Sequence, residues 1–245
     1  MTGLIPIALL LGPVRRVHAR AERPAGDDTS VGYLSILRQP AVQWLTALTF
    51  VATFIGYGQL EAGMPGFSRQ VAEVSTRTIG LAFAVNTAVI VVLQFWMLSR
   101  ISGRRRTRVM VVMAAIWAVA WGLLGLAGAV AGGAVAIGGV LGFMAVFALG
   151  ETLMQPSVPA MSNDLAADHT RGRYNAISSA AFQGGAICGP VVAGFLLDHD
   201  LGAAYIGVMV LGCLAIVAMA RALERHVPTA ANGIPEPEEQ PIALS

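Results

Sequence analysis

Lysine is absent from this 245-residue sequence, and charged residues of any kind make up only 12% of it. All 16 basic residues are therefore arginines, and the formal net charge is +2. So small a net charge gives no indication of a nucleic-acid partner.

Cysteine is nearly absent as well, with two residues in the sequence. Because Cys188 and Cys213 both lie inside apolar runs, the sequence suggests neither a disulfide framework nor a thiolate metal site.

Residue patterns typical of metal centres and nucleotide sites are missing as well. The four histidines lie in expected loops or tails, without ligand partners at useful spacing: His18, His169, His199 and His226. No Gly-x-x-x-x-Gly-Lys pattern occurs, so we expect no cofactor and no direct use of ATP. An intramembrane enzyme would need a nucleophile–base pair or a metal constellation. Since the sequence shows neither, we predict that the protein is not an enzyme.

Long apolar runs are what the sequence has in abundance, with 56% hydrophobic residues and a mean hydropathy of +0.67. Six uncharged stretches are 41–60, 78–99, 109–131, 134–150, 174–197 and 201–220, and residues 151–160 extend the fourth. Roughly 20 apolar helical residues cross a hydrocarbon core about 30 Å thick. Uninterrupted runs favour helices over a barrel. The sequence therefore predicts an all-α integral membrane protein with six transmembrane helices.

The arginines are distributed unevenly between the two sides of the expected membrane. Fourteen of the 16 precede the first run, lie between the second and third, precede the fifth or follow the sixth. Only Arg69 and Arg77, between the first two runs, fall on the opposite side. The positive-inside rule then places both termini and the arginine-rich loops in the cytoplasm.

The chain divides into four expected parts. Residues 1–12 are apolar but too short to span, which suits the remnant of a preceding helix. Residues 13–38 are expected to be a cytoplasmic linker, and residues 39–227 hold the six helices. Residues 228–245, with four prolines and three glutamates, are expected to be a disordered cytoplasmic tail. Six spans also form two sets of three that cross in opposite directions, which permits an inverted repeat.

Residues 150–198 carry a resemblance to a known family: GETLMQPSVPAMSNDLAADHTRGRYNAISSAAFQGGAICGPVVAGFLLD. This stretch resembles the tenth and eleventh helices of the major facilitator superfamily, in its twelve-helix drug:proton antiporter members. Residues 56–61, GYGQLE, resemble the seventh helix of that family. The likeness covers roughly residues 33–227. It implies that this chain is a carboxyl-terminal half of six helices, with residues 13–38 as the central cytoplasmic loop.

Two motifs within the resemblance imply roles in gating and packing. Gly185, Gly189, Pro190 and Gly194 resemble the core of the family's antiporter motif. Independently of that likeness, glycines four apart let a neighbouring helix approach closely, and a proline can bend the helix. The resemblance implies gating, and the spacing by itself implies close packing; the two roles are compatible.

The cytoplasmic loop after the second span resembles a second family signature. Gly103, Arg104 and Arg105 match the end of that signature, but Arg100 stands at its aspartate position, so the expected charge partner is absent from the loop. We therefore favour a role as an orientation anchor, with contact to anionic lipid headgroups as a smaller contribution. Arg171 and Arg173 form a second cytoplasmic cluster. It is expected to act in structure and gating through a loop carboxylate or helix carbonyls.

Glu151 is the only ionisable residue inside the apolar regions, and it lies below the expected midplane. An intramembrane charge costs roughly 2.5 to 3.5 kcal/mol on insertion scales, so the side chain should face the protein interior or a wet cavity. One interpretation makes Glu151 a proton or substrate site. The other makes it a structural carboxyl near the cytoplasmic surface, held by Arg171 or Arg173.

Tyr57, Gln59 and Glu61 form a second candidate at the outer end of the first span, where several glycines make the backbone easy to deform. They are expected either to border a substrate pathway or to form an interfacial polar cap. Gln155 joins the pathway candidates, and the amides of Asn86, Gln94 and Gln183 are weaker ones, since a lone amide more often bonds another helix. Trp117 and Trp121, four apart, are expected to make packing or lipid contacts.

Together these features predict a secondary transporter of the plasma membrane that exports small amphipathic compounds in exchange for protons. Its expected partners are the lipid bilayer, a small-molecule substrate, and a complementary six-helix half or a second copy. One alternative is a non-transporting membrane protein that binds and regulates a full transporter. The other is an inactive fragment.

Overall fold

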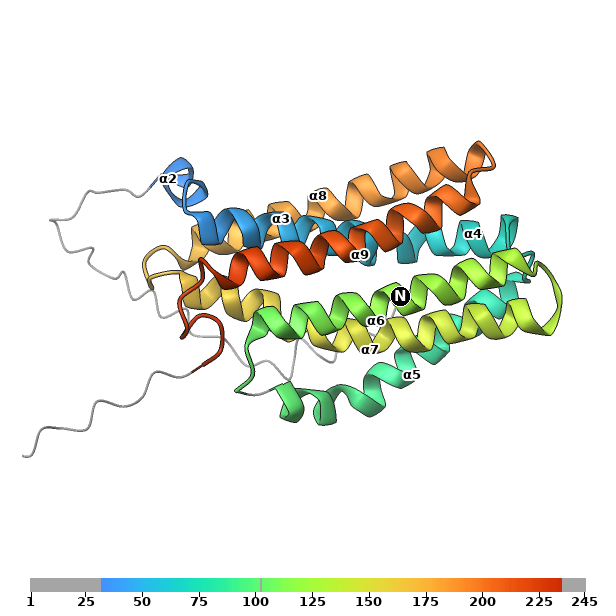
Figure 1. The fold of residues 1–245 in the computed structure, drawn as a ribbon, viewed down its shortest axis with the longest axis horizontal. Helices are drawn as coiled ribbons and strands as arrows, with labels where there is room; N and C mark the ends of the chain where they lie inside the picture. Colours follow the sequence, from blue (N-terminus) through green and yellow to red (C-terminus); the bar gives the residue numbers. More distant parts are fainter. Residues whose placement is uncertain (1–31, 102, 235–245) are drawn as a thin grey trace, which may run out of the picture. The chain divides into compact units, whose positions relative to one another are not determined.

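The computed structural model describes residues 32–101 and 103–234, and every regular element in these residues is a helix. The elements are α2 (Tyr33–Leu37), α3 (Pro40–Ile55), the π-helical turn η1 (Gln59–Gly63), α4 (Met64–Gln70), α5 (Thr76–Ile101), α6 (Arg106–Ala129), α7 (Gly133–Leu165), α8 (Arg171–Asp198) and α9 (Gly202–Glu224) (Figure 1). Within the described residues, six helical segments are long and apolar enough to cross a membrane, with α3, η1 and α4 counting as one. The prediction of six transmembrane helices is confirmed.

The first span is longer than the sequence indicated. It was expected to end near residue 60, but the helical path continues from Pro40 to Gln70 through η1 and α4. At Gly56 the backbone leaves helical geometry, with φ −102° and ψ −100°, and η1 follows. Pro65 does not stop the helix because it lies in the first turn of α4, where a proline is tolerated.

Helix pairing follows the pattern of an inverted repeat. The helix α3 packs against α8 and α9, while α7 packs against α5 and α6. The two groups of contacts correspond if α3 is matched with α7, α5 with α8, and α6 with α9. The contact between α3 and α8 then matches the contact between α7 and α5, and the contact between α3 and α9 matches the contact between α7 and α6. The remaining large contact, between α6 and α9, matches itself. The two sets of three helices therefore pack as two inverted repeats, as expected for half of a twelve-helix transporter fold.

Aromatic side chains fill the interior between α6, α7 and α9. The Trp117 ring stacks on Phe147 with centroids 4.6 Å apart, and its indole N–H donates a hydrogen bond of 3.0 Å to the Phe147 carbonyl. Trp121 packs against Phe143 and Tyr205. Both tryptophans are fully buried, which confirms that they are packing residues. Close packing of this kind stabilises helix association in lipid, where water no longer drives it.

One end of the helix set collects most of the arginines, and we call it the arginine end. Because successive spans alternate in direction, α5 ends there, α6 begins there, and α8 begins and α9 ends there as well. Among the described arginines, only Arg69 and Arg77 belong to the opposite end. The uneven distribution seen in the sequence is thus a property of the folded helices.

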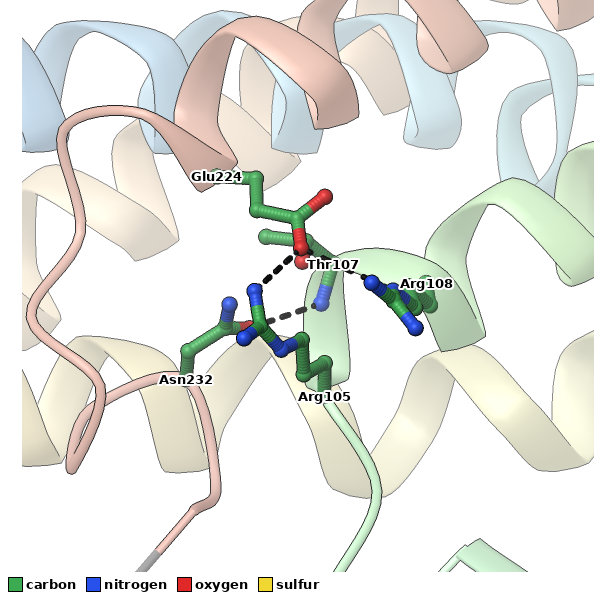
Figure 2. A network of polar contacts seen from close by, with 5 residues as sticks. All are labelled: Arg105, Thr107, Arg108, Glu224 and Asn232. Atoms are coloured by element: carbon green, nitrogen blue, oxygen red, sulfur yellow. Dashed lines mark hydrogen bonds and ion pairs between the residues drawn. The ribbon is translucent and has the colours of Figure 1, made fainter.

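A polar network joins the start of α6 to the chain that follows α9 (Figure 2). The Arg105 and Arg108 guanidinium groups lie 2.8 and 3.6 Å from the Glu224 carboxylate. The backbone N–H of Thr107 donates to the Asn232 side chain at 3.0 Å, and that of Arg106 donates to the Asn232 carbonyl at 2.9 Å. Asn232 thereby satisfies two amides at a helix start that have no partner within the helix.

This network corrects the prediction of a disordered tail from residue 228. Residues 228–234 form hydrogen-bonded turns, and Asn232 is only 3% exposed. Composition alone suggested disorder, whereas the unpaired amides of α6 give this segment a partner. The rest of the expected tail (235–245), the expected helix remnant (1–12) and most of the expected linker (13–31) lie outside the described residues.

Replacing Glu224 with glutamine should destabilise the arginine end modestly. The substitution leaves Arg105 and Arg108 facing each other without their shared carboxylate. Because the pair is partly exposed, we expect the free energy of unfolding to fall by about 1 kcal/mol or less. Thermal unfolding in detergent at low and high salt measures the effect, which should shrink as salt rises. Asp168→Asn, which removes the far more exposed partner of Arg171, is the matched control and should change nothing measurable.

Candidate functional site

Glu151 lies on α7 with its carboxyl group turned into the protein, and the residue is 9% exposed. The Asn86 side-chain amide of α5 lies 3.4 Å both from one Glu151 carboxyl oxygen and from the Met144 carbonyl. On the other side, the hydroxyl of Tyr57, a residue that follows α3, lies beside the carboxyl group. A buried carboxyl with partners from two other helices is what an intramembrane carboxyl requires.

The cluster extends one turn along α7 to Gln155. Its side-chain amide donates a hydrogen bond of 2.6 Å to the Tyr57 hydroxyl. We call Asn86, Tyr57, Glu151 and Gln155 the Glu151 cluster. It joins α3, α5 and α7, so a change in the protonation of its one carboxyl group would act on three helices at once.

Two cavities flank this cluster. The first, of about 400 Å³, lies between α5 and α7 and is lined by Ile90, Gln94, Glu151, Thr152, Gln155 and Pro156. The second, of about 360 Å³, lies between α3, α7 and α8. Tyr57, Gln155 and Phe182 contribute to its lining, together with Asn175, Ser178 and Ser179. Gln155 lines both cavities, so the Glu151 cluster forms the partition between them.

The second cavity has a lining that mixes aromatic rings with polar side chains. Tyr57 and Phe182 place two rings at its wall, with centroids 5.5 Å apart. Around them stand amides and hydroxyls from α7 and α8. Small-molecule sites commonly combine an apolar and aromatic lining with a few polar groups that fix orientation.

The side chains of Gln59 and Glu61, which formed one candidate with Tyr57 in the sequence, have surroundings different from those of Tyr57. Gln59 is fully buried: its amide donates to the Phe54 carbonyl at 2.8 Å, and its carbonyl accepts from the Tyr205 hydroxyl at 3.1 Å. Glu61 is exposed on η1 and lines neither cavity. The reason is geometric, because successive helical residues point in different directions and only Tyr57 faces α7.

The glycine motif of α8 makes a close helix crossing, as its spacing indicated. A Cβ atom added at Gly189 would lie 2.9 Å from the Phe54 carbonyl oxygen and 3.0 Å from the Gly58 Cα. One added at Gly185 would overlap the Phe50 carbonyl. Gly194 differs, because nothing lies within 4 Å of the corresponding position. Pro190 lies within α8, which is continuous around it.

The arginine motif finds its acidic partners outside its own loop. Gly103 takes a positive φ of +72°, and Arg104 is exposed. Arg105 pairs with Glu224 of α9, 119 residues away, and Arg106 pairs with Asp164 at the end of α7 at 2.6 Å. The aspartate missing from the loop is therefore replaced by carboxylates from other helices.

The second arginine cluster lies at the start of α8. Arg171 pairs with Asp168 at 3.0 Å, which is the expected contact with a loop carboxylate. Arg173 lies in the first turn of the same helix. Glu151 is hydrogen-bonded to Asn86 and lies beside Tyr57, whereas Arg171 is paired with Asp168.

Asn86 of α5 and Gln183, which lines the second cavity from α8, were only weak candidates in the sequence, and the other α8 residues of that cavity were not candidates. Asn86 does bond another helix, as expected of a lone amide, but the group that it meets is Glu151. Ser178, Ser179 and Phe182 gave no signal, because small and aromatic residues are common in any membrane helix. Across residues 32–101 and 103–234, no group of three histidines, cysteines or carboxylates is arranged to hold a metal ion.

Comparison with known proteins gives two findings. The model of the Major Facilitator Superfamily matches residues 74–244, more than half of the chain. A Bacillus subtilis (strain 168) protein described as "Uncharacterized MFS-type transporter YttB" is 37% identical over 59 residues. That alignment covers 24% of this chain and 15% of the relative. No solved structure gives a significant match.

Proposed function

We propose, because the chain belongs to the Major Facilitator Superfamily, that it works as a secondary active transporter exporting small amphipathic compounds in exchange for protons. The observation that carries this proposal is the Glu151 cluster, a single buried carboxyl group between two cavities. Glu151 binds and releases the proton. The substrate occupies the cavity beside Tyr57 and Phe182.

The helices around the cluster support a coupling between proton and substrate. Tyr57 touches Glu151 on one side and lines the substrate cavity on the other. Two residues later, η1 replaces regular α-helix with a π-helical turn, a feature found often at functional sites. A rearrangement of the cluster can therefore move the outer part of the first span, η1 and α4, relative to α3.

Alternating access requires a second wall facing these cavities. We propose that another six-helix body supplies it, either within a longer chain, as a separate chain or as a second copy. We also propose that the arginine end faces the cytoplasm of the cell, as the positive-inside rule indicates, and that the membrane is the plasma membrane.

Proton flux in proteoliposomes tests the function directly. The chain is reconstituted with a pH-sensitive dye inside, and tetraphenylphosphonium, an apolar cation, is added together with a panel of uncharged amphipathic compounds. We expect substrate-dependent movement of protons, either from the chain alone or after co-reconstitution with a six-helix amino-terminal half of the family. Chemical cross-linking of the same samples reports whether two six-helix bodies are associated.

A chain that associates with a second body but moves no protons with any compound would contradict the proposal. That result would favour the other function considered, a non-transporting protein that regulates a full transporter. Absence of both association and flux would indicate an inactive fragment.

A further inference from the structure

A third cavity, of about 560 Å³, lies at the arginine end between α5 and α6. It exists because α5 packs against α7 rather than along α6. Trp96 and Met97 line it from α5, and Val112 and Ile116 line it from α6. Its size falls within the range of roughly 300 to 1,000 Å³ typical of ligand sites.

One end of this cavity carries a concentrated positive charge. Arg100, Arg104, Arg105 and Arg108 line it, and none of the carboxylates within residues 32–101 and 103–234 does. The nearby Glu224 carboxylate is shared between Arg105 and Arg108. Within residues 32–101 and 103–234, Arg100 and Arg104 have no carboxylate partner; Arg100 lies over the Trp96 ring, 5.0 Å from its centroid.

The other end of the cavity is apolar and opens away from the helix set. Val112 and Trp96 are each 52% exposed although both belong to membrane-spanning helices. Leu153 of α7 closes the inner side. A small soluble anion would contact only the arginines, whereas a molecule with an anionic head and a hydrocarbon chain would contact both ends.

We propose that this cavity binds one anionic phospholipid. Its phosphate is held by Arg100 and Arg104, since guanidinium groups bind phosphate oxygens through paired hydrogen bonds. Its acyl chain follows the apolar lining along Val112 and Ile116. The bound lipid neutralises Arg100 and Arg104, which Glu224 and Asp164 do not reach, and it connects α5 to α6 at a point where they make little contact. This inference does not depend on the proposed transport function.

Quenching of Trp96 fluorescence by brominated lipid tests the proposal. The full chain is reconstituted in phosphatidylcholine vesicles with rising fractions of phosphatidylglycerol carrying dibrominated acyl chains. The Trp96 signal is the difference between the chain and its Trp96→Phe variant. We expect Trp96 to be quenched at a far lower fraction of brominated phosphatidylglycerol than of brominated phosphatidylcholine. Trp44, on α3 at the same end, should show no such preference in the equivalent Trp44→Phe comparison. Equal quenching of Trp96 by both lipids would overturn the proposal.

Matched variants test the arginine part and the apolar part of the cavity one at a time. The double variant Arg100→Gln/Arg104→Gln should raise the phosphatidylglycerol fraction for half-quenching by about 25-fold, at about fivefold per arginine. Arg221→Gln/Arg225→Gln, which removes the same charge from the last turn and C-cap of α9 at the same end, should leave it unchanged. Val112→Trp should weaken the preference by filling the apolar part, while Val119→Trp, two turns along the same exposed helix face, should not. Similar effects of variant and control in either pair would contradict a localised lipid site.

Two further measurements identify the molecule that occupies the cavity. A large excess of inorganic phosphate should not restore Trp96 fluorescence; if it does, the cavity is a phosphate site without a lipid. Deletion of residues 235–245, which contain Glu236, Glu238 and Glu239, should leave lipid binding within twofold. A tenfold or greater gain on deletion would mean that the acidic tail competes for the cavity, and it would overturn the lipid as the normal occupant.

Discussion

Replacing Gly185 with leucine is expected to abolish the packing of α3 against α8 and, with it, the folded protein. A Cβ atom at this position would lie 2.8 Å from the Phe54 backbone nitrogen and 2.9 Å from the Thr53 Cβ, and would overlap the Phe50 carbonyl. Overpacking costs roughly 1 to 3 kcal/mol where side chains can give way. Here the obstacle is largely the backbone of α3, so the loss should exceed that range. Size-exclusion chromatography and thermal unfolding in detergent measure the folded fraction.

The same helix provides the control. Gly194→Leu changes a glycine of the same motif, but nothing lies within 4 Å of the added Cβ. We expect the folded yield and unfolding temperature of this variant to match those of the unaltered chain. Gly185→Ala should lie between the two, with a loss of more than about 2 kcal/mol. If Gly185→Leu and Gly194→Leu behaved alike, the close crossing of α3 and α8 would be wrong.

The charge-free runs predicted the membrane helices well because their signal is local. An apolar run of sufficient length has only one way to cross a bilayer, whatever its neighbours are. The end of the first span was harder to predict. Gly56, Gly58 and Pro65 look like helix breakers in sequence. In the structure, the two glycines lie between α3 and the π-helical turn η1, and Pro65 lies in the helix α4 that follows.

The candidate site depended on information that the sequence does not carry. Glu151 could be singled out as the one carboxyl group in an apolar region, yet its partner Asn86 lies 65 residues away. Tyr57 and Gln59 looked equivalent, and only the fold shows that one faces a cavity and the other is buried against Tyr205. Pairings between distant helices, such as Arg105 with Glu224, likewise follow from packing and not from local pattern.

Replacing Glu151 with glutamine should eliminate proton-coupled transport while leaving the protein folded. Glutamine keeps the shape of the side chain and can still bond Tyr57 and Asn86, but it cannot bind and release a proton. Positioned proton-transfer groups contribute about 100-fold or more to the reactions that use them. Substrate-driven proton flux in proteoliposomes should therefore fall by at least about this factor, to near background.

Infrared spectroscopy gives a readout of the same substitution that needs no substrate. The unaltered chain should show several carboxyl C=O bands that change with pH, and Glu151→Gln should remove the one that belongs to Glu151. Glu61→Gln is the matched control, because Glu61 is exposed on η1 and lines neither cavity. It should preserve both the band and the flux. Retention of proton flux by Glu151→Gln, or an equal loss in Glu61→Gln, would show that the Glu151 cluster is a structural contact between α3, α5 and α7 and not the proton site.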